Sequence, residues 1–307
     1  MAVPSGTLTG TSAISNLVQT AYDQYVRMAL RSIPVMRALA DVKPVQQAMP
    51  GSSVVFSIYS DLAQATSTLT ESTDVSSIAL GNPNQITVTL QEYGSAVTTT
   101  KKLNLTSFND VDAALADIIA YNAADSIDAV VAGVLTSGTN IIYGGTATNT
   151  AGITAGSTIS VSDIRAAVTN LRSNKALPRI GELYAAYLHP KQTADLRAET
   201  GTGGFQDLSK YVDRTPFVAG AVGVLEGAFI VETPRVPYTS NGTTNVYSAI
   251  IAGREALAEA QGQDISTVIG PQIDALRRFH TIGWYYFGGW NILRTAALYN
   301  IQTATAY

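Results

Sequence analysis

Two stretches of the chain alternate between apolar and polar residues with a period of two, which is typical of half-buried strands. The first covers residues 53–59 and the second residues 86–91, and their apolar positions are Val54, Phe56 and Ile58, then Ile86, Val88 and Leu90. We predict that these strands pair as a ribbon. Residues 63–83 between them are rich in Ser, Thr, Asn and Gly, which predicts a projecting polar loop with few residues that could anchor a core. A two-stranded ribbon is only marginally stable by itself, so we expect it to lie on another copy of the chain.

A long helix is predicted over residues 107–135, with Thr106 or Ser107 as its N-cap. At ~1.5 Å per residue it would span about 40 Å, enough to form the spine of a domain. Its apolar stripe consists of Val111, Leu115, Ile118, Ile119, Ile127, Val130, Val131, Val134 and Leu135. Residues 12–40 also carry apolar residues at helical intervals, broken by Pro34, which predicts a kinked N-terminal arm.

The second half of the chain shows a mixed α/β pattern. We predict strands at residues 183–188, 227–232 and 245–252, and helices at residues 191–197 and 254–260. A further helix is predicted after an N-cap at Ser162, with Ile164, Val168 and Leu171 on one face. Residues 272–297 alternate in places, notably at Ile282, Trp284 and Tyr286, and we expect strands there to return and pack on the long helix.

Composition adds limits on function. Only 14% of the 307 residues are charged, against ~25% in ordinary soluble proteins, which suits a chain that hides surface in contacts with its own copies. The formal net charge of -4 argues against nucleic-acid binding by bulk electrostatics. The absence of cysteine excludes disulfides and thiolate metal sites. The N-terminus lacks a signal-peptide pattern and no window reaches ~18 uninterrupted apolar residues, so we expect a soluble protein made in the cytoplasm, with no membrane partner.

The ribbon and its loop carry an unbalanced charge. Residues 51–100 contain four carboxylates and neither Lys nor Arg. We therefore predict that this segment docks on a basic surface of a neighbouring copy; the alternative is an acidic loop in contact with solvent only. The candidate contact residues are Asp61, Glu71, Asp74 and Glu92 on the acidic side and Arg27, Arg31, Arg37 and Lys43 on the basic side.

Carboxylates and histidines offer little catalytic chemistry. Asp117, Asp125 and Asp128 on the long helix could suggest a metal site, but such helical sites pair Glu with a nearby His, and none is present. We interpret these three residues as a solvated acidic face. His189 and His280 lie far apart in sequence without HExxH spacing, which disfavours catalysis and zinc binding. We expect His189 to close a strand-to-helix turn.

Two other patterns resemble binding motifs only superficially. Gly201, Gly203 and Gly204 lack the flanking residues of a phosphate-binding loop, so we interpret them as a surface loop. Arg277 and Arg278 precede an aromatic run that could stack on nucleic-acid bases, but aromatic residues at alternating strand positions are more often core. We therefore predict no enzymatic activity, no catalytic residue, no cofactor and no bound metal.

The order of these elements resembles that of tailed-bacteriophage major capsid proteins of the Hong Kong 97 type. The resemblance covers nearly the whole chain and implies an α+β fold with an N-terminal arm, an extended β-hairpin loop, a peripheral domain with a long spine helix, and an axial α/β domain. Local phrases add to it: Leu69 and Glu71, residues 88–94 (VTLQEYG), the helix over 105–128, Leu188-His189-Pro190, Leu196-Arg197 and residues 223–227 (GVLEG). None of these is a catalytic signature, so the resemblance rests on their order.

The resemblance implies five regions. These are the N-terminal arm (1–50), the extended loop (51–100), the peripheral domain with its spine helix (101–182), the axial domain (183–260), and C-terminal strands that return to the peripheral domain (261–307). It further implies a coat protein that self-assembles, as pentamers and hexamers, into the icosahedral shell around the double-stranded DNA of a tailed phage. The implied partners are portal and scaffold or decoration proteins. The implied location is the virion capsid, assembled in the host cytoplasm.

One departure from the family has a consequence. Some relatives cross-link covalently through a lysine on the extended loop, and this loop has none, so we expect a shell held without covalent bonds. The predicted arm begins almost at Met1, so we also expect no cleaved scaffolding domain. Two alternatives remain open: an encapsulin-like nanocompartment shell protein of the same fold, and an α/β hydrolase or binding protein. The lack of convergent His, Cys and acidic residues counts against the latter.

Overall fold

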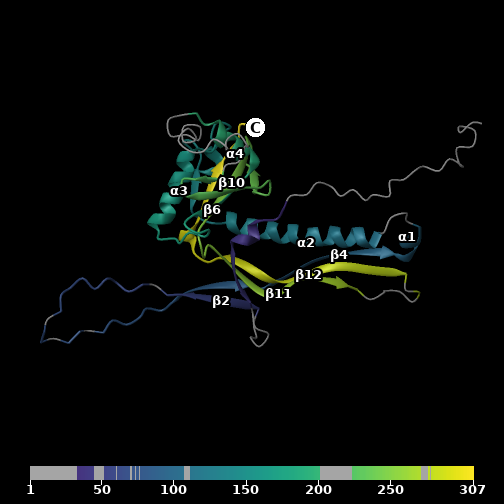
Figure 1. Ribbon diagram of the computed structural model, residues 1–307, viewed down its shortest axis with the longest axis horizontal. Helices are drawn as coiled ribbons and strands as arrows, with labels where there is room; N and C mark the ends of the chain where they lie inside the picture. The colour runs from purple at the N-terminus through teal and green to yellow at the C-terminus, as the bar shows by residue number, and fades with distance from the viewer. Residues whose placement is uncertain are drawn as a thin grey trace, which may run out of the picture.

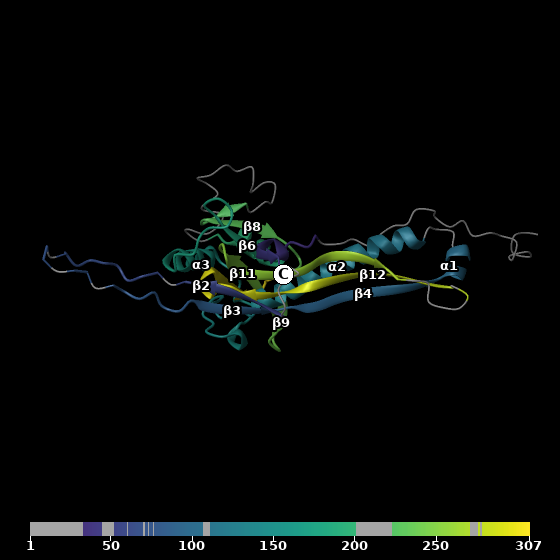
Figure 2. The same cartoon turned by 90° about the horizontal axis from the view of Figure 1, so that it is seen from below.

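The described part of this elongated molecule consists of three sheets, one long helix and several shorter helices (Figure 1). The computed structural model describes residues 33–44, 52–59, 61–69, 71–72, 74–75, 77–106, 111–200, 223–270, 276 and 278–307. A compact α/β unit stands at one end of the long helix α2, which runs along a second sheet. A two-stranded ribbon extends from the body in the opposite direction to α2, as both views show (Figures 1 and 2).

A four-stranded sheet carries α2 (Val111–Thr136) on one face. Its order is β1 (Ala40–Pro44), β11 (Leu257–Ile269), β12 (Phe279–Ile292) and β4 (Gln91–Thr100), with β1 parallel to β11 and the other pairs antiparallel. The short helix α1 (Lys101–Thr106) connects β4 toward α2. The shared core includes Leu115, Ile119, Ile127, Val131 and Leu135 from α2 and Ile282, Trp284, Tyr286 and Trp290 from β12. The predictions of a long helix, of a strand returning to it, and of aromatic residues in the core are confirmed.

Residues Leu115–Thr136 of α2 are long and apolar enough to cross a membrane, by length and composition only. A core helix of a soluble protein passes the same test. Because the apolar stripe of α2 packs on β12, this single helix is weak evidence for a membrane segment.

The strand β11 replaces a predicted helix. The helix prediction for residues 254–260 is wrong, because Leu257 begins a strand of 13 residues. Leu257 faces the core under α2, whereas Ala258 and Ala260 face a second small core on the other side of the sheet. A strand that is covered on both faces loses the alternation of apolar and polar residues, so its sequence cannot be told from a short buried helix.

The α/β unit is built on a seven-stranded sheet. Its order is β5 (Ile141–Tyr143), β13 (Leu298–Thr303), β10 (Asn245–Ala252), β6 (Tyr184–Leu188), β8 (Ala228–Glu232) and β7 (Val224–Leu225), and β9 (Tyr238–Ser240) pairs with β10. The helix α3 (Val161–Ser173) packs on this sheet through Ile164, Val168 and Leu171, and α4 (Pro190–Ala198) adds Leu196. The predicted strands at 183–188, 227–232 and 245–252 and the helix at 191–197 are confirmed.

Two local features of this unit differ from expectation. Ser160, not Ser162, caps α3: its hydroxyl accepts a hydrogen bond from the Asp163 amide, and the Asp163 carboxylate accepts one from the Ser160 amide. This reciprocal pair is a capping box, and its Ser-x-x-Asp spacing is visible in the sequence. The last strand, β13, pairs with β10 in this sheet, and it meets only the end of α2, where the Asn300 side-chain amide donates to the Leu135 carbonyl at 3.0 Å.

Short 3₁₀ helices are η2 (Met36–Leu39), η3 (Thr150–Gly152) and η4 (Thr295–Ala297). Of the predicted N-terminal arm, only residues from 33 onward are described, so the kinked helix before Pro34 lies outside the described residues. The glycine loop at 201–204 and Arg277 lie outside them as well.

The ribbon consists of β2 (Ser53–Ile58) and β3 (Asn84–Thr89), paired antiparallel with Val54 opposite Val88, as predicted. Its base does not depend on another copy. Val54, Val88 and Leu90 form a small core with Ala258 and Ala260 of β11, on the face of the sheet away from α2. The expectation that the ribbon needs another copy for support is therefore wrong for its base, which the chain's own sheet holds.

Candidate assembly surfaces

Beyond Ile58 the ribbon widens into a loop that extends away from the body (Figure 1). All described residues between 61 and 82 are exposed to solvent, and the loop projects past the body in both views (Figures 1 and 2). Its large apolar residues are Leu62, Leu69, Val75, Ile78 and Leu80, with exposed fractions from 56% for Leu62 to 76% for Leu69. Covering such surface is worth about 25 cal/mol per Å². A concentration of exposed apolar residues on one segment marks a contact surface.

The prediction of a polar loop with few residues that could anchor a core gave no role to these five residues together. They follow neither a period of two nor a period of 3.6, so no strand or helix pattern draws attention to them. Large aliphatic residues within a Ser- and Thr-rich loop were themselves the available signal.

The predicted acidic contact residues are exposed in the structure. Asp61 and Glu71 lie on the loop and have no hydrogen-bond or ion-pair partner within the described part of the chain. The Asp74 carboxylate accepts a hydrogen bond only from the neighbouring Val75 amide, at 2.8 Å. Glu92 lies on β4 beside Tyr285, where burial and the Glu92 charge raise the pKa of the tyrosine.

The predicted basic contact residues have a different environment. Arg27 and Arg31 lie outside the described residues. Arg37 is engaged within its own chain: its Nη2 donates to Glu259 Oε1 at 2.7 Å and its Nε to Glu259 Oε2 at 3.2 Å. Lys43 Nζ lies 5.0 Å from the centre of the Phe56 ring, at the base of the ribbon.

Glu259 is a fully buried carboxylate with two partners. Besides Arg37, it accepts a hydrogen bond from the Tyr286 hydroxyl at 2.8 Å. The Arg37 guanidinium lies 5.5 Å from the centre of the Tyr286 ring, and that ring stacks on Trp290. Burial, together with the Glu259 carboxylate, raises the pKa of Tyr286, so the phenol stays protonated and continues to donate. Arg37 thus covers the Tyr286 ring and neutralises Glu259 at one edge of the main core.

The carboxylates of α2 do not form the solvated acidic face that the sequence indicated. Asp128 is buried, and its Oδ1 accepts from the Met36 amide at 2.6 Å while its Oδ2 accepts from Arg235 Nε at 2.6 Å. Arg235 also forms an ion pair with Asp125. The interpretation fails because Arg235, which follows β8, comes from more than a hundred residues away. Only Asp117 is exposed as expected.

Residues 36–44 therefore form a strap across the molecule. Asp41 accepts from Arg179 Nη1 at 3.3 Å and from the Glu255 amide at 2.8 Å, and the same arginine donates to the Ala40 carbonyl at 3.1 Å. Together with the bonds of Asp128 and Glu259, these contacts join α2, the four-stranded sheet and the α/β unit. The strap uses its charged residues internally, which leaves fewer of them for neighbours.

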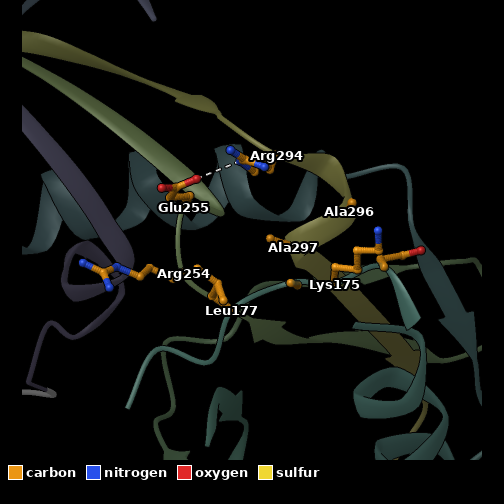
Figure 3. Close-up of a pocket in the computed structure, with 9 residues that line it drawn as sticks. Lys175, Leu177, Arg254, Glu255, Arg294, Ala296 and Ala297 are labelled. Carbon is orange, nitrogen blue, oxygen red and sulfur yellow. Dashed lines mark ion pairs between the residues drawn. The ribbon is translucent and has the colours of Figure 1, made fainter. Parts of the chain in front are cut away.

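A pocket of about 270 Å³ opens where the α/β unit meets the four-stranded sheet (Figure 3). It is lined by Asn174, Lys175, Ala176, Leu177, Arg254, Glu255, Arg294, Ala296 and Ala297. Arg294 pairs with Glu255 at 2.7 Å, whereas Lys175 and Arg254 have no hydrogen-bonding or ion-pair partner for their side chains among the described residues. Three cations and one carboxylate give the pocket a formal charge of +2.

His189 has a structural role in the fold. His189 is the N-cap of α4, and its Nδ1 accepts a hydrogen bond from the Lys191 amide at 3.2 Å, which confirms the predicted strand-to-helix turn. Burial, and to a lesser degree the Lys191 charge, lowers the pKa of His189 and favours the neutral ring that this bond needs. Across the part of the chain that the structure covers, no group of three or more His, Cys, Asp or Glu residues could hold a metal.

Solved structures with a similar architecture are phage and phage-like capsids. The capsid of the cyanophage P-SCSP1u has a TM-score of 0.74 to this chain at 17% sequence identity, covering 95% of this chain and 94% of its own. The head structure of the Helicobacter pylori bacteriophage KHP40 has a TM-score of 0.72 at 13% identity and covers 99% of both chains. The capsid of a native GTA particle has a TM-score of 0.69 at 17% identity, covering 97% of this chain and 100% of its own.

At these identities the structural likeness shows the fold, and the predicted α+β capsid fold is confirmed. A search of curated proteins finds no match. Nothing in the matches supports a nanocompartment shell or a hydrolase. The model of the family described as phage capsid protein matches residues 11–294. Because that match spans most of the chain, the chain belongs to the phage capsid protein family and is a structural major capsid protein.

Proposed function

We propose that copies of this protein close an icosahedral shell around the double-stranded DNA of a tailed phage, and that the loop at residues 61–82 of each copy lies on a neighbouring copy. The observation that carries the proposal is the set of exposed aliphatic residues on this loop, which no described residue of the same chain covers. The base of the ribbon is packed on β11, so the body holds the loop away from itself. In a shell, a neighbouring copy supplies the surface that can cover the loop.

Each of the five regions has its own role in the shell. The arm (1–50) and the extended loop (51–100) make contacts between copies, and the region 101–182 with α2 forms the periphery of each pentamer or hexamer. The α/β unit, which consists of the region 183–260 together with β5, α3 and β13, lies toward the five-fold and six-fold axes. The strand β12 of the C-terminal region (261–307) supports α2. Portal and scaffold or decoration proteins complete the particle, which assembles in the host cytoplasm. The chain has no catalytic activity of its own.

Charge directs the contact between loop and neighbour. Asp61, Glu71, Asp74 and Glu92 face cations of the next copy, since residues 51–100 have no cation to pair with them. Arg27, Arg31 and Lys43 remain candidate partners from the arm. Arg37 contributes less, because Glu259 already neutralises it within its own chain. Complementary charge sets the register of such contacts more than their strength.

The test is negative-stain electron microscopy with mass determination of the chain expressed alone, and again with a candidate scaffold if needed. A variant with Leu62, Leu69, Val75, Ile78 and Leu80 replaced by Ser should fail to form shells while keeping the unfolding curve of the parent subunit. The matched control replaces Val224 and Tyr238, exposed on the α/β unit, by Ser. If the loop variant assembles as well as this control, the loop does not hold neighbours together.

A further inference from the structure

The pocket between the α/β unit and the four-stranded sheet combines unpaired cations with an apolar floor. Lys175 and Arg254 lie on opposite sides of it, and Leu177 and Ala297 lie between them (Figure 3). Leu177 is 60% exposed although it lines a hollow. Large exposed apolar side chains beside free charges are typical of surfaces that a partner covers.

Backbone hydrogen bonds hold the two turns that carry these cations. The Lys175 amide donates to the Arg172 carbonyl at 3.0 Å at the end of α3, and the Arg254 amide donates to the Leu177 carbonyl at 2.8 Å. Lys175 has a φ of 57° and Glu255 a φ of 59°, in the left-handed region that favours glycine. Lys175 takes this conformation as the residue that ends α3, where the Ala176 amide donates to the Leu171 carbonyl at 3.0 Å.

The apex of the ribbon loop carries the complementary groups. Glu71 and Asp74 supply two negative charges against the +2 of the pocket, and Leu69 and Val75 flank them with exposed apolar surface. Neither carboxylate has a cation within the described part of its own chain. The loop and the pocket thus match in charge and in apolar character, and each lacks a partner in the isolated chain.

Most other described arginines are already in use. Arg165, Arg179 and Arg235 each form an ion pair within the chain, as does Arg37. Lys43 lies on the Phe56 ring. The pocket is where two unpaired cations and an apolar hollow occur together.

We infer that this pocket receives the loop apex of a second copy, with Glu71 and Asp74 facing Lys175 and Arg254 and with Leu69 or Val75 on the apolar floor. The inference rests on the proposed contact between loop and neighbour, and it names the receiving surface. It moves the basic side of that contact from the N-terminal arm to the junction of the two sheets.

The absence of cysteine allows a direct test by cross-linking. Two variants carry paired substitutions, Glu71→Cys with Lys175→Cys and Asp74→Cys with Arg254→Cys. The control combines Glu71→Cys with Lys191→Cys, an exposed lysine on α4. Assembled particles are oxidised mildly and run on non-reducing denaturing gels. We expect ladders of multimers from the two test pairs, which collapse on reduction, and a single band from the control.

A second measurement covers a failure of the cysteine variants to assemble. Lys175→Glu with Arg254→Glu should lower particle yield by roughly tenfold or more, since like charges would then face each other. Adding Glu71→Lys and Asp74→Lys to the same chain should restore it. Equal cross-linking of the control, or no rescue by the charge exchange, would overturn the inference. If loop cysteines instead join Lys43→Cys or Lys191→Cys of a neighbour, the pocket is the wrong receptor while the proposed contact between loop and neighbour stands.

Discussion

Replacing Asp128 by Asn should destabilise the folded subunit more than any other single carboxylate change on α2. The side chain is 1% exposed and bonds three groups: the amides of Met36 and Arg37 through Oδ1, and Arg235 Nε through Oδ2. One carboxylate therefore joins the long helix, the strap and the turn after β8. Breaking it loosens three parts of the molecule at once.

The expected loss of stability depends on which hydrogen bonds the partners of residue 128 retain in the variant. Asn retains an acceptor oxygen for Met36 but sets an amide NH₂ against the Arg235 guanidinium, whose side chain is 10% exposed. Removing one partner of a buried ion pair costs ~3–5 kcal/mol when the other is left unpaired. Arg235 keeps Asp125, by an ion pair and by a hydrogen bond to the Asp125 carbonyl at 2.9 Å. We therefore expect a loss of about 2–4 kcal/mol, with about 1 kcal/mol more for Asp128→Ala, which also orphans the Met36 amide.

The assay is urea unfolding of unassembled subunits, followed by tryptophan fluorescence. Trp284 and Trp290 are the two tryptophans of the chain, and both lie on β12 in the core under α2, so their emission reports on this region. Asp117→Asn, on the same helix but exposed, is the matched control and should change stability by less than ~0.5 kcal/mol. A loss below about 1 kcal/mol for Asp128→Asn, or one equal to that of the control, would refute the reasoning.

Three further outcomes are expected. The pKa of His189 is lower in the folded state than in the unfolded state, so the unfolded state binds a proton more readily. The free energy of unfolding should therefore be highest above the ordinary pKa of 6.5 and should fall as the pH drops below it. Urea unfolding at a series of pH values should show this fall, and His189→Asn should remove it, because Asn is a good N-cap that does not titrate. Gly289→Ala would press a methyl group against the Thr89 carbonyl of β3 and should cost ~1–3 kcal/mol, whereas Gly133→Ala meets open space on α2 and should add ~0.5–1 kcal/mol, both measured by the same unfolding curves. Denaturing gels of mature particles should show one band near 32.3 kDa, because residues 51–100 contain no lysine to cross-link, and a ladder that survives reduction would contradict this.

Local patterns in the sequence were enough for several elements. The pairing of residues 53–58 with 84–89, the long helix, and the strands β6, β8 and β10 could be predicted, because a period of two or 3.6 is written into neighbouring residues. The order of those elements indicated the capsid family, which the comparisons then showed. The same reasoning missed β11 and the exposed aliphatic residues of the loop. Neither follows a regular period, one because both faces are buried and the other because neither is.

Which charged residues form ion pairs within the chain, by contrast, was decided only by the tertiary structure. Arg37 meets Glu259 across 222 positions of sequence, and Met36 meets Asp128 across 92, and no local pattern encodes such a pair. A carboxylate on a helix looks the same in sequence whether water or an arginine faces it. The sequence therefore determined which charges the chain has and that the ribbon has none that are positive. The packing of the strap, α2 and the α/β unit decided which charges are neutralised within the chain, because an ion pair depends on which surfaces the fold brings together, and so it also decided which charges are left for a second copy.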